Sequence, residues 1–66
     1  MEYVKNKVYK LRKEKGVTQE ELARIVGVSR QTVLVLEKGN YTPSLLLGLK
    51  IAKFFGKTVE EVFTFK

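Results

Sequence analysis

Cysteine and histidine are both absent from this 66-residue chain, and proline occurs once. Without cysteine the fold cannot rest on disulfides, and without either residue type a zinc site of ordinary composition cannot be assembled. The same absence removes the commonest acid–base group and the thiol nucleophile of enzymes. No glycine-rich phosphate loop is present either. The sequence therefore predicts no metal site, no cofactor, no small-molecule ligand and no catalytic activity.

Long apolar runs are also missing, since none approaches the ~20 residues that a membrane-spanning helix requires. The start, Met1-Glu2-Tyr3-Val4-Lys5, does not resemble a signal peptide because no apolar run follows its basic residue. We therefore expect a soluble cytoplasmic protein that does not engage membranes.

The length predicts one domain over residues 1–66. A chain of about 60 residues buries only roughly 60% of the surface that it exposes when unfolded, so its stability needs additional support. With disulfides and metals excluded, close helix packing and self-association are the remaining means.

Basic residues outnumber acidic ones by 13 to 7, which gives a net charge of +6. A positive field of this size on a small body favours polyanions such as nucleic acid. A solvated, colloidally stable surface would have the same composition, so the residue pattern must decide between the two interpretations.

Glycines divide the chain into segments with helical spacing, and glycine accepts the left-handed conformation that ends a helix. Asn6 is a candidate N-cap for the first segment, and Pro43 is placed to form the first turn of the fourth. In the fourth segment, Leu45, Leu49, Ala52 and Phe55 recur at helical spacing. The pattern predicts five short helices, near 6–15, 18–26, 30–38, 43–55 and 59–63.

Two of these helices begin with the same signal, Thr18-Gln19-Glu20-Glu21 and Thr58-Val59-Glu60-Glu61. Threonine followed three residues later by glutamate predicts a capping box. The adjacent glutamates point about 100° apart on a helix and do not face one pocket, so capping explains them better than catalysis.

The two ends of the chain carry β-branched and aromatic residues outside good helical patterns, at Tyr3-Val4 and Phe63-Thr64-Phe65. They are compatible with a minimal two-stranded ribbon, which would have to lie on the helices to be stable.

The unit from 18 to 38 carries the function in our interpretation. Two helices, each with its own N-cap at Thr18 or Ser29, are joined by a very short turn at Gly27. Such a turn forces a steep crossing, which requires a small contact residue, and Ala23 stands in that place. The apolar positions around them are filled by Leu22, Val26, Val28, Val33 and Leu36.

The strings TQEELA, VSRQTV, LEKG, TPSL and LKIAKFFG occur in the order and spacing of the phage-repressor/Cro (XRE-like) family of helix-turn-helix proteins, which the chain resembles from about Val8 to Phe63. The resemblance implies an all-α, compact five-helix repressor-like domain whose third helix enters the major groove of double-stranded DNA. It also implies a prokaryotic transcriptional regulator.

Carried over by position, the resemblance assigns contacts to bases and to phosphates. Arginine suits the edge of guanine and glutamine that of adenine, whereas small polar side chains suit phosphate oxygens. The implied base contacts are Arg30, Gln31, Thr32 and Val35. The implied phosphate contacts are Thr18, Gln19, Ser29, Asn40, Tyr41, Thr42 and Ser44.

Arg12 and Glu37 fall on the inward sides of their helices, at positions where the family often has a partly buried ion pair. We expect this pair to be structural, because breaking a buried pair leaves one charge without a partner.

Four residues depart from the family's pattern: Leu34, Val35, Leu46 and Gly48. Val35 could meet a thymine methyl, and Leu34 and Leu46 could belong to an apolar patch that binds another chain. For Leu46 we favour a place in an enlarged core. Gly48 stands in mid-helix, where it costs about 0.5–1 kcal/mol relative to alanine.

A small core and a single recognition helix predict a homodimer that binds an inverted repeat. Candidate interface residues are Val59, Val62, Phe63 and Phe65, although Val62 and Phe63 are equally compatible with core packing. A protein-interaction module, such as an antitoxin-like partner or a dimeric adaptor, is the alternative function.

Overall fold

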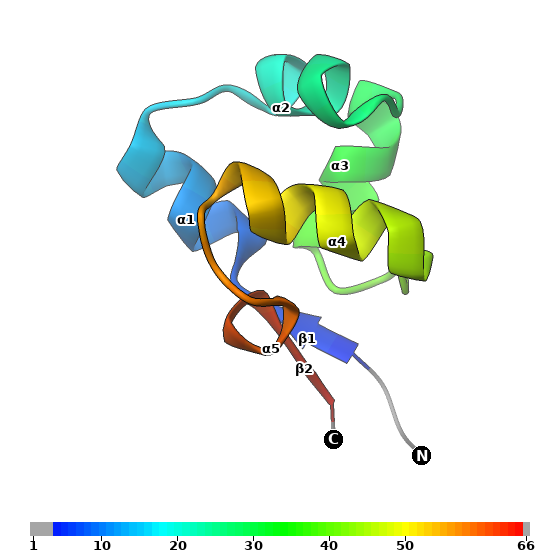
Figure 1. Ribbon diagram of the computed structural model, residues 1–66. Helices are drawn as coiled ribbons and strands as arrows, with labels where there is room; N and C mark the ends of the chain where they lie inside the picture. The colour runs from blue at the N-terminus through cyan, green and yellow to red at the C-terminus, as the bar shows by residue number, and fades with distance from the viewer. Residues whose placement is uncertain (1–3, 66) are drawn as a thin grey trace.

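The computed structural model describes residues 4–65 (Figure 1). Five helices and a two-stranded sheet are present in that range, as the sequence predicted. Tyr3, expected in the ribbon, lies outside the described residues. The elements are β1 Val4–Asn6, α1 Val8–Lys15, α2 Gln19–Val26, α3 Arg30–Glu37, α4 Leu45–Phe54, α5 Val59–Val62 and β2 Phe63–Phe65.

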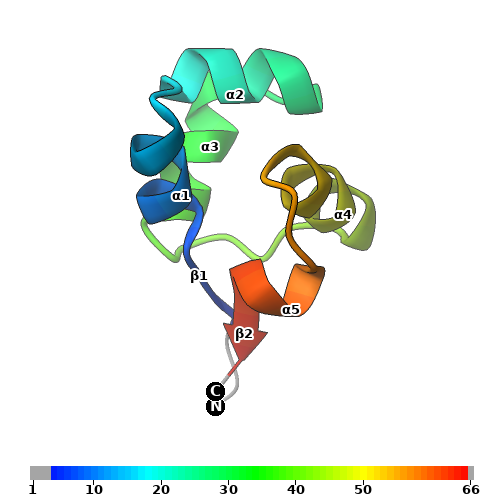
Figure 2. The same ribbon diagram turned by 60° about the vertical axis from the view of Figure 1, so that its left-hand side comes forward.

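The helices surround one apolar core. In Figure 2, α1 and α3 lie on one side of it and α4 on the other, while α2 closes one end and α5 with the ribbon closes the opposite end. The side chains that are fully enclosed come from every helix: Val8, Leu22, Val33, Leu36, Ile51 and Val62. None of the helices within residues 4–65 has the length and apolar character needed to cross a bilayer.

The buried face of α4 differs from the one that the sequence pattern indicated. Leu47, Gly48, Ile51 and Ala52 face the core, whereas Leu45 and Leu49 are exposed. Gly48 lies beside the Phe63 ring, and a Cβ built there would make an ordinary van der Waals contact, 3.8 Å from Phe63 Cε2.

The core interpretation of Leu46 is therefore wrong, because this side chain is 63% exposed. Leucines follow one another at the start of α4, so the sequence offers more than one apolar stripe and periodicity alone could not choose between them.

Two helices also start two residues later than predicted, at Val8 and Leu45. Helix α1 has Lys7 at its N-cap position, but Asn6 still serves the cap because its Oδ1 accepts a hydrogen bond from the Val8 N–H at 3.0 Å. Helix α4 begins after Pro43, with Ser44 as the N-cap whose Oγ accepts from the Leu47 N–H. In both cases a short polar side chain satisfies an N–H that has no partner within the helix.

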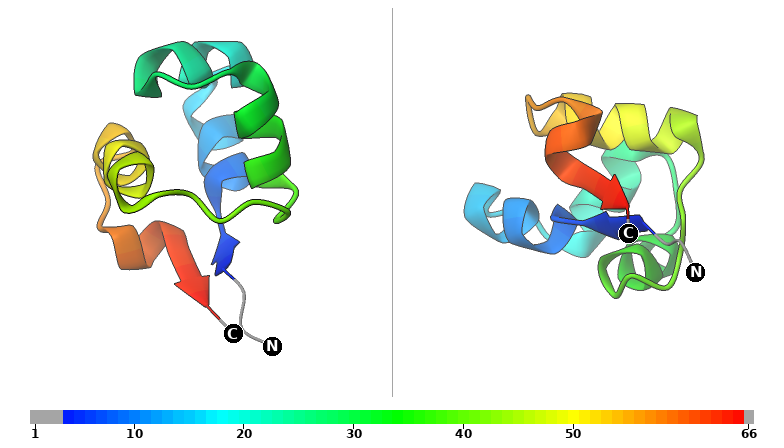
Figure 3. Two further views of the ribbon diagram at one scale, coloured as in Figure 1. Left: turned by 90° about the vertical axis from the view of Figure 1, so that its right-hand side faces the viewer. Right: turned by 90° about the horizontal axis from the view of Figure 1, so that it is seen from below.

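The ribbon is antiparallel and pairs Val4 with Phe65 and Asn6 with Phe63 (Figure 3). Its attachment to the helices is polar as well as apolar. Asn6 Nδ2 donates to the carbonyl oxygen of Leu36 at 2.9 Å, and the Lys7 N–H donates to that of Val62 at the same distance. The ribbon is thus fixed to the end of α3, which meets the requirement that an isolated two-stranded sheet be supported.

Candidate nucleic-acid interface

The turn between α2 and α3 is built on Gly27. Its φ of +77° lies in the left-handed region, and its N–H donates to the carbonyl oxygen of Ala23 at 2.9 Å. The Val28 N–H donates to the same oxygen at 3.0 Å. Ala23 is buried between the helices. The sharp turn and the small contact residue let α3 cross closely beneath α2, as the sequence predicted (Figure 1).

The first turn of α3 presents polar side chains to solvent. Arg30 and Gln31 are exposed, whereas Val33 and Leu36, further along the same helix, are buried. Ser29 Oγ caps the helix by accepting from the Thr32 N–H at 3.1 Å, and the Ser29 and Thr32 hydroxyls lie 3.0 Å apart. Arg30 and Gln31 thus project from a backbone that is held at its start.

Leu34 and Val35 occupy an intermediate position on α3, because both are half-buried. Each keeps part of its apolar surface exposed next to the polar first turn. The structure therefore leaves Val35 accessible to an apolar ligand group such as a methyl.

A hollow of about 640 Å³ opens where α1, α2 and α3 meet. It brings together Thr18, Gln19 and Arg30, which the sequence had assigned to phosphate and base contacts. Besides Arg12, two of its lining side chains are basic and one is acidic, so its local charge favours an anion. The lining residues are Arg12, Lys13, Gly16, Val17, Thr18, Gln19, Glu20 and Arg30.

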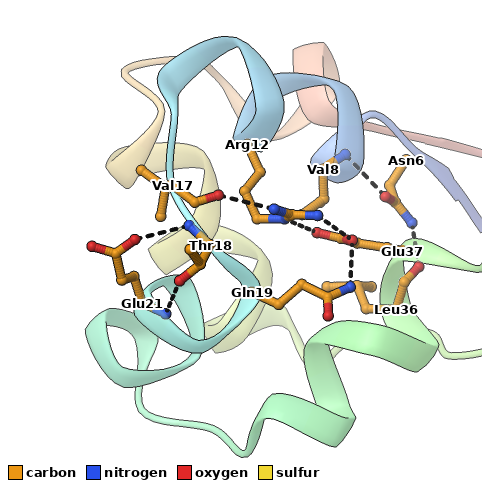
Figure 4. A network of polar contacts seen from close by, with 9 residues as sticks. All are labelled: Asn6, Val8, Arg12, Val17, Thr18, Gln19, Glu21, Leu36 and Glu37. Carbon is orange, nitrogen blue, oxygen red and sulfur yellow. Dashed lines mark hydrogen bonds and ion pairs between the residues drawn. The ribbon is translucent and has the colours of Figure 1, made fainter.

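A buried ion pair joins α1 to α3 beside this hollow (Figure 4). Arg12 Nε donates to Glu37 Oε2 at 2.6 Å, and Arg12 Nη2 donates to Oε1 at 3.1 Å. The side chains are only 8% and 4% exposed, respectively. The hydrogen bond with Glu37 raises the pKa of Arg12, against the opposing effect of burial. Arg12 and Glu37 thus lie paired at the positions that the sequence assigned.

The sequence did not predict that Gln19 joins this pair. Its Nε2 donates to Glu37 Oε1 at 3.0 Å, so the first residue of α2 is tied to the last residue of α3. Arg12 also donates from Nη1 to the carbonyl oxygen of Val17 at 2.9 Å. These contacts depend on how three helices pack, and no spacing along the chain signals them.

The start of α2 is a complete capping box. Thr18 Oγ1 accepts from the Glu21 N–H at 3.0 Å, and Glu21 Oε1 accepts from the Thr18 N–H at 2.9 Å. This backbone hydrogen bond, with a smaller contribution from the Thr18 hydroxyl, lowers the pKa of Glu21. The N–H groups at the start of α2 are thereby oriented next to the hollow.

The remaining residues assigned to phosphate contact lie elsewhere. Asn40, Tyr41 and Thr42 are exposed in the connection from α3 to α4, and Ser44 is exposed at the N-cap of α4. An eight-residue helix such as α3 is about 12 Å long. The predicted phosphate contacts thus form two groups, one at the N-terminal ends of α2 and α3 and one in the connection that follows α3.

The candidate interface residues at the end of the chain separate by burial. Val62 lies in the core at 1% exposure, so it has no surface to offer a partner. Val59 and Phe63 are half-buried and line an apolar groove of about 130 Å³ beside Leu45. Phe65 is 71% exposed.

An apolar surface lies on α4, where the favoured core placement of Leu46 was wrong and the alternative, an apolar patch, fits its exposure. Leu45, Leu46 and Leu49 are all exposed there, and Leu45 borders the same groove as Phe63. We refer to these three residues as the α4 leucine face.

Comparison with known sequences gives a consistent result. A family model described as helix-turn-helix matches residues 8–62. The chain is 51% identical over 63 residues to an uncharacterised HTH-type transcriptional regulator of Methanocaldococcus jannaschii, with 96% of each chain covered. It is 40% identical over 57 residues to the cryptic phage CTXphi transcriptional repressor RstR of Vibrio cholerae, covering 86% of this chain and 51% of the repressor.

Solved structures show the same arrangement of elements. The restriction-modification controller protein C.AhdI from Aeromonas hydrophila is similar with a TM-score of 0.76 and 34% identity, over 83% of each chain. The crystal structure of a putative DNA-binding protein from Bacteroides fragilis is similar with a TM-score of 0.82 and 23% identity, over 92% of this chain and 98% of that one. At that identity the second similarity concerns the fold alone.

Proposed function

Because the chain belongs to the phage-repressor/Cro (XRE-like) helix-turn-helix family, we propose that it is a repressor that binds a specific double-stranded DNA operator through α3. One observation carries the proposal: Arg30 and Gln31 project into solvent from the capped first turn of a helix whose other face is buried. The N-terminal turn of a recognition helix is the part that meets base edges in the major groove.

The side chains of α3 match the chemistry of those edges. Arg30 can pair with O6 and N7 of guanine, and Gln31 with N6 and N7 of adenine. Val35 offers methyl groups to a thymine methyl. Thr32 shares its hydroxyl with Ser29, so its contact with a base is made alongside that capping interaction.

Phosphate contacts on both sides of α3 fix the helix in the groove in this proposal. Thr18, Gln19 and Ser29 supply one set of contacts, at the N-terminal ends of α2 and α3, and a second set follows α3. Contacts of this kind set orientation and register but carry no sequence information. The second set is Asn40, Tyr41, Thr42 and Ser44.

We further propose that two copies bind together to an inverted repeat. The α4 leucine face and Phe65 expose more apolar surface than isolated residues would, and Val59 and Phe63 line the groove beside it. Recognition helices related by a two-fold axis meet successive major grooves about 34 Å apart. The interface that we propose comprises Leu45, Leu46, Leu49, Val59, Phe63 and Phe65.

Selection from a randomised duplex pool at fixed salt tests operator recognition. We expect enrichment of an inverted repeat, and we expect Gln31→Ala to lose preference at one position of each half-site, by about 1–3 kcal/mol. Salt-sensitive binding without any enriched sequence would contradict the proposal. It would favour the alternative, a protein-interaction module with only non-specific affinity for DNA.

Two exposed arginines of the helix-turn-helix unit provide a matched pair. Arg30→Ala and Arg24→Ala each remove one positive charge, but only Arg30 lies in the first turn of α3. We expect Arg30→Ala to relax the base preference and Arg24→Ala to change affinity equally for all sequences. Identical effects of the two variants would show that Arg30 acts through charge alone.

Light scattering during size-exclusion chromatography tests self-association. We expect a dimer for the natural chain and a folded monomer for Leu46→Glu. Thr64→Glu, on the exposed residue between the two ribbon phenylalanines, serves as the control. A strictly monomeric natural chain at high micromolar concentration would exclude the dimer while leaving DNA binding to be judged by the selection.

A further inference from the structure

We propose that Glu37 is a positioning residue for DNA binding. Its carboxylate holds the Gln19 side-chain amide so that one N–H of Nε2 is engaged and the other is ready to donate to a backbone phosphate oxygen. This inference rests on the proposed function, because it concerns the phosphate contact at the start of α2.

The carboxylate of Glu37 is itself immobilised. Arg12 donates to both of its oxygens, and the same guanidinium is fixed from behind by its bond to the Val17 carbonyl oxygen. With only 4% of the Glu37 side chain exposed, water does not compete for these bonds. Oε1 therefore has a defined position, from which it can accept from a further donor.

That fixed oxygen determines how Gln19 is oriented. An ionised carboxylate only accepts hydrogen bonds, so the amide must turn its nitrogen, not its oxygen, toward Glu37. Gln19 Nε2 donates to Glu37 Oε1, and Gln19 Oε1 faces away from Glu37 (Figure 4). Among residues 4–65, no other hydrogen bond involves the Gln19 side chain, so the second N–H of Nε2 remains available.

The position of Gln19 makes that N–H accessible to an anion. The residue is half-buried and lines the hollow that it shares with Arg30 and Lys13. Glu20 also lines the hollow, and its carboxylate opposes an anion there. A donor already held in place spares the complex the ordering of a flexible glutamine, which improves affinity without any additional contact.

A double-mutant cycle on DNA affinity distinguishes positioning from a merely structural role. The probe is a fluorescently labelled duplex of about two helical turns and mixed sequence, because phosphate contacts do not require the operator. We expect Gln19→Ala to weaken binding about 10-fold, the usual scale for a hydrogen bond to a charged group. We expect Glu37→Gln to weaken binding severalfold in the natural chain but by less than about twofold in the Gln19→Ala background.

Equal effects of Glu37→Gln in both backgrounds would overturn the inference. If the natural chain fails to bind the duplex at any salt concentration, the proposed function itself fails, so the two failures are distinguishable. Glu60→Gln is the matched control, since it makes the same chemical change on an exposed residue of α5 and should leave DNA affinity unchanged.

A second variant and a spectroscopic measurement cover the case in which Glu37→Gln does not fold. Replacing Arg12 and Glu37 together by methionine removes both charges, and buried ion pairs often tolerate such apolar replacement. As for Glu37→Gln, we expect this double replacement to weaken DNA binding less in the Gln19→Ala background than in the natural chain. In the natural chain, nuclear magnetic resonance should show slow exchange for one Gln19 Nε2 proton and a shift of the other on adding the duplex. Two equivalent, rapidly exchanging protons would contradict the positioning role.

Discussion

Helices α2 and α5 begin with the same local chemistry. Thr18 has φ −80° and ψ 163°, and Thr58 has φ −79° and ψ 162°. Both threonines accept from the N–H three residues later, at 3.0 and 3.2 Å, and both receive the carboxylate of that residue on their own N–H, at 2.9 and 2.7 Å. The capping box thus produces the same helix start in two different places.

The two starts differ in the residue that follows the threonine. In α2 this residue is Gln19, which bonds to the buried Glu37 and lines the basic hollow. In α5 it is Val59, which packs against the core. The cap specifies where a helix begins, whereas the first helical residue and its tertiary neighbours determine whether the start can serve a ligand.

The largest effect is expected from removing the Glu37 carboxylate, which bonds the first residue of α2 and, within residues 4–65, has no counterpart at the start of α5. Glu37→Ala leaves the Arg12 guanidinium buried without its partner, and we expect a loss of about 3–5 kcal/mol in the free energy of unfolding. Urea denaturation followed by circular dichroism measures it. Glu60→Ala, on the exposed second residue of α5, is the control and should change stability by less than about 0.5 kcal/mol. A similarly small loss for Glu37→Ala would show that the ion pair is dispensable.

Removing either cap should lower the folding stability by the same amount, whereas only removal of the α2 cap should lower DNA affinity. Thr18→Ala and Thr58→Ala each leave an N–H of the first turn without its side-chain acceptor, at a cost of about 1 kcal/mol. Only Thr18→Ala should also weaken binding to a DNA duplex, because only α2 adjoins the hollow. Urea denaturation and fluorescence anisotropy give the two quantities. An equal loss of DNA affinity in both variants would attribute the binding effect to general destabilisation.

The smallest expected effect is the pH dependence that the two boxes share. Hydrogen bonds from the Thr18 and Thr58 N–H groups lower the pKa of Glu21 and of Glu61 from the ordinary glutamate value. A lowered pKa in the folded state means that the stabilisation is present at neutral pH and is lost as the pH falls from the unfolded pKa through the folded one. Glu21→Gln and Glu61→Gln should each flatten the acid limb of stability by a similar amount, because glutamine keeps the hydrogen bond without titrating.

Denaturant midpoints measured from neutral pH down to about pH 3, below the ordinary glutamate pKa, would show this. If the midpoints of both variants fall with decreasing pH as steeply as those of the natural chain, the pH dependence comes from other carboxylates.

The same contrast explains which features the sequence could predict. The capping boxes and the Gly27 turn depend on residues within a few positions of one another, so their pattern is readable along the chain. The pair of Arg12 and Glu37 followed from the family resemblance. The bond of Gln19 to Glu37 depends on a crossing of helices, and no local pattern encodes it.

The face of α4 escaped prediction for a different reason. Leu45, Leu46, Leu47 and Leu49 give the helix apolar residues on more than one side, so the spacing is compatible with several rotations. Packing against the other helices selects the rotation in which Leu47, Gly48, Ile51 and Ala52 face the core and Leu45, Leu46 and Leu49 face outward.

The ribbon has a consequence for the order of folding events. Val4 and Phe65 are paired although nearly the whole described chain lies between them, so this contact closes the largest loop in the molecule. The helices make contacts between residues that are closer in sequence, so they can assemble before the entropic cost of closing that loop arises. The Asn6 bond to the Leu36 carbonyl oxygen then sets the completed ribbon on the end of α3. We therefore expect the ribbon of β1 and β2 to form last during folding and to separate first under thermal fluctuation.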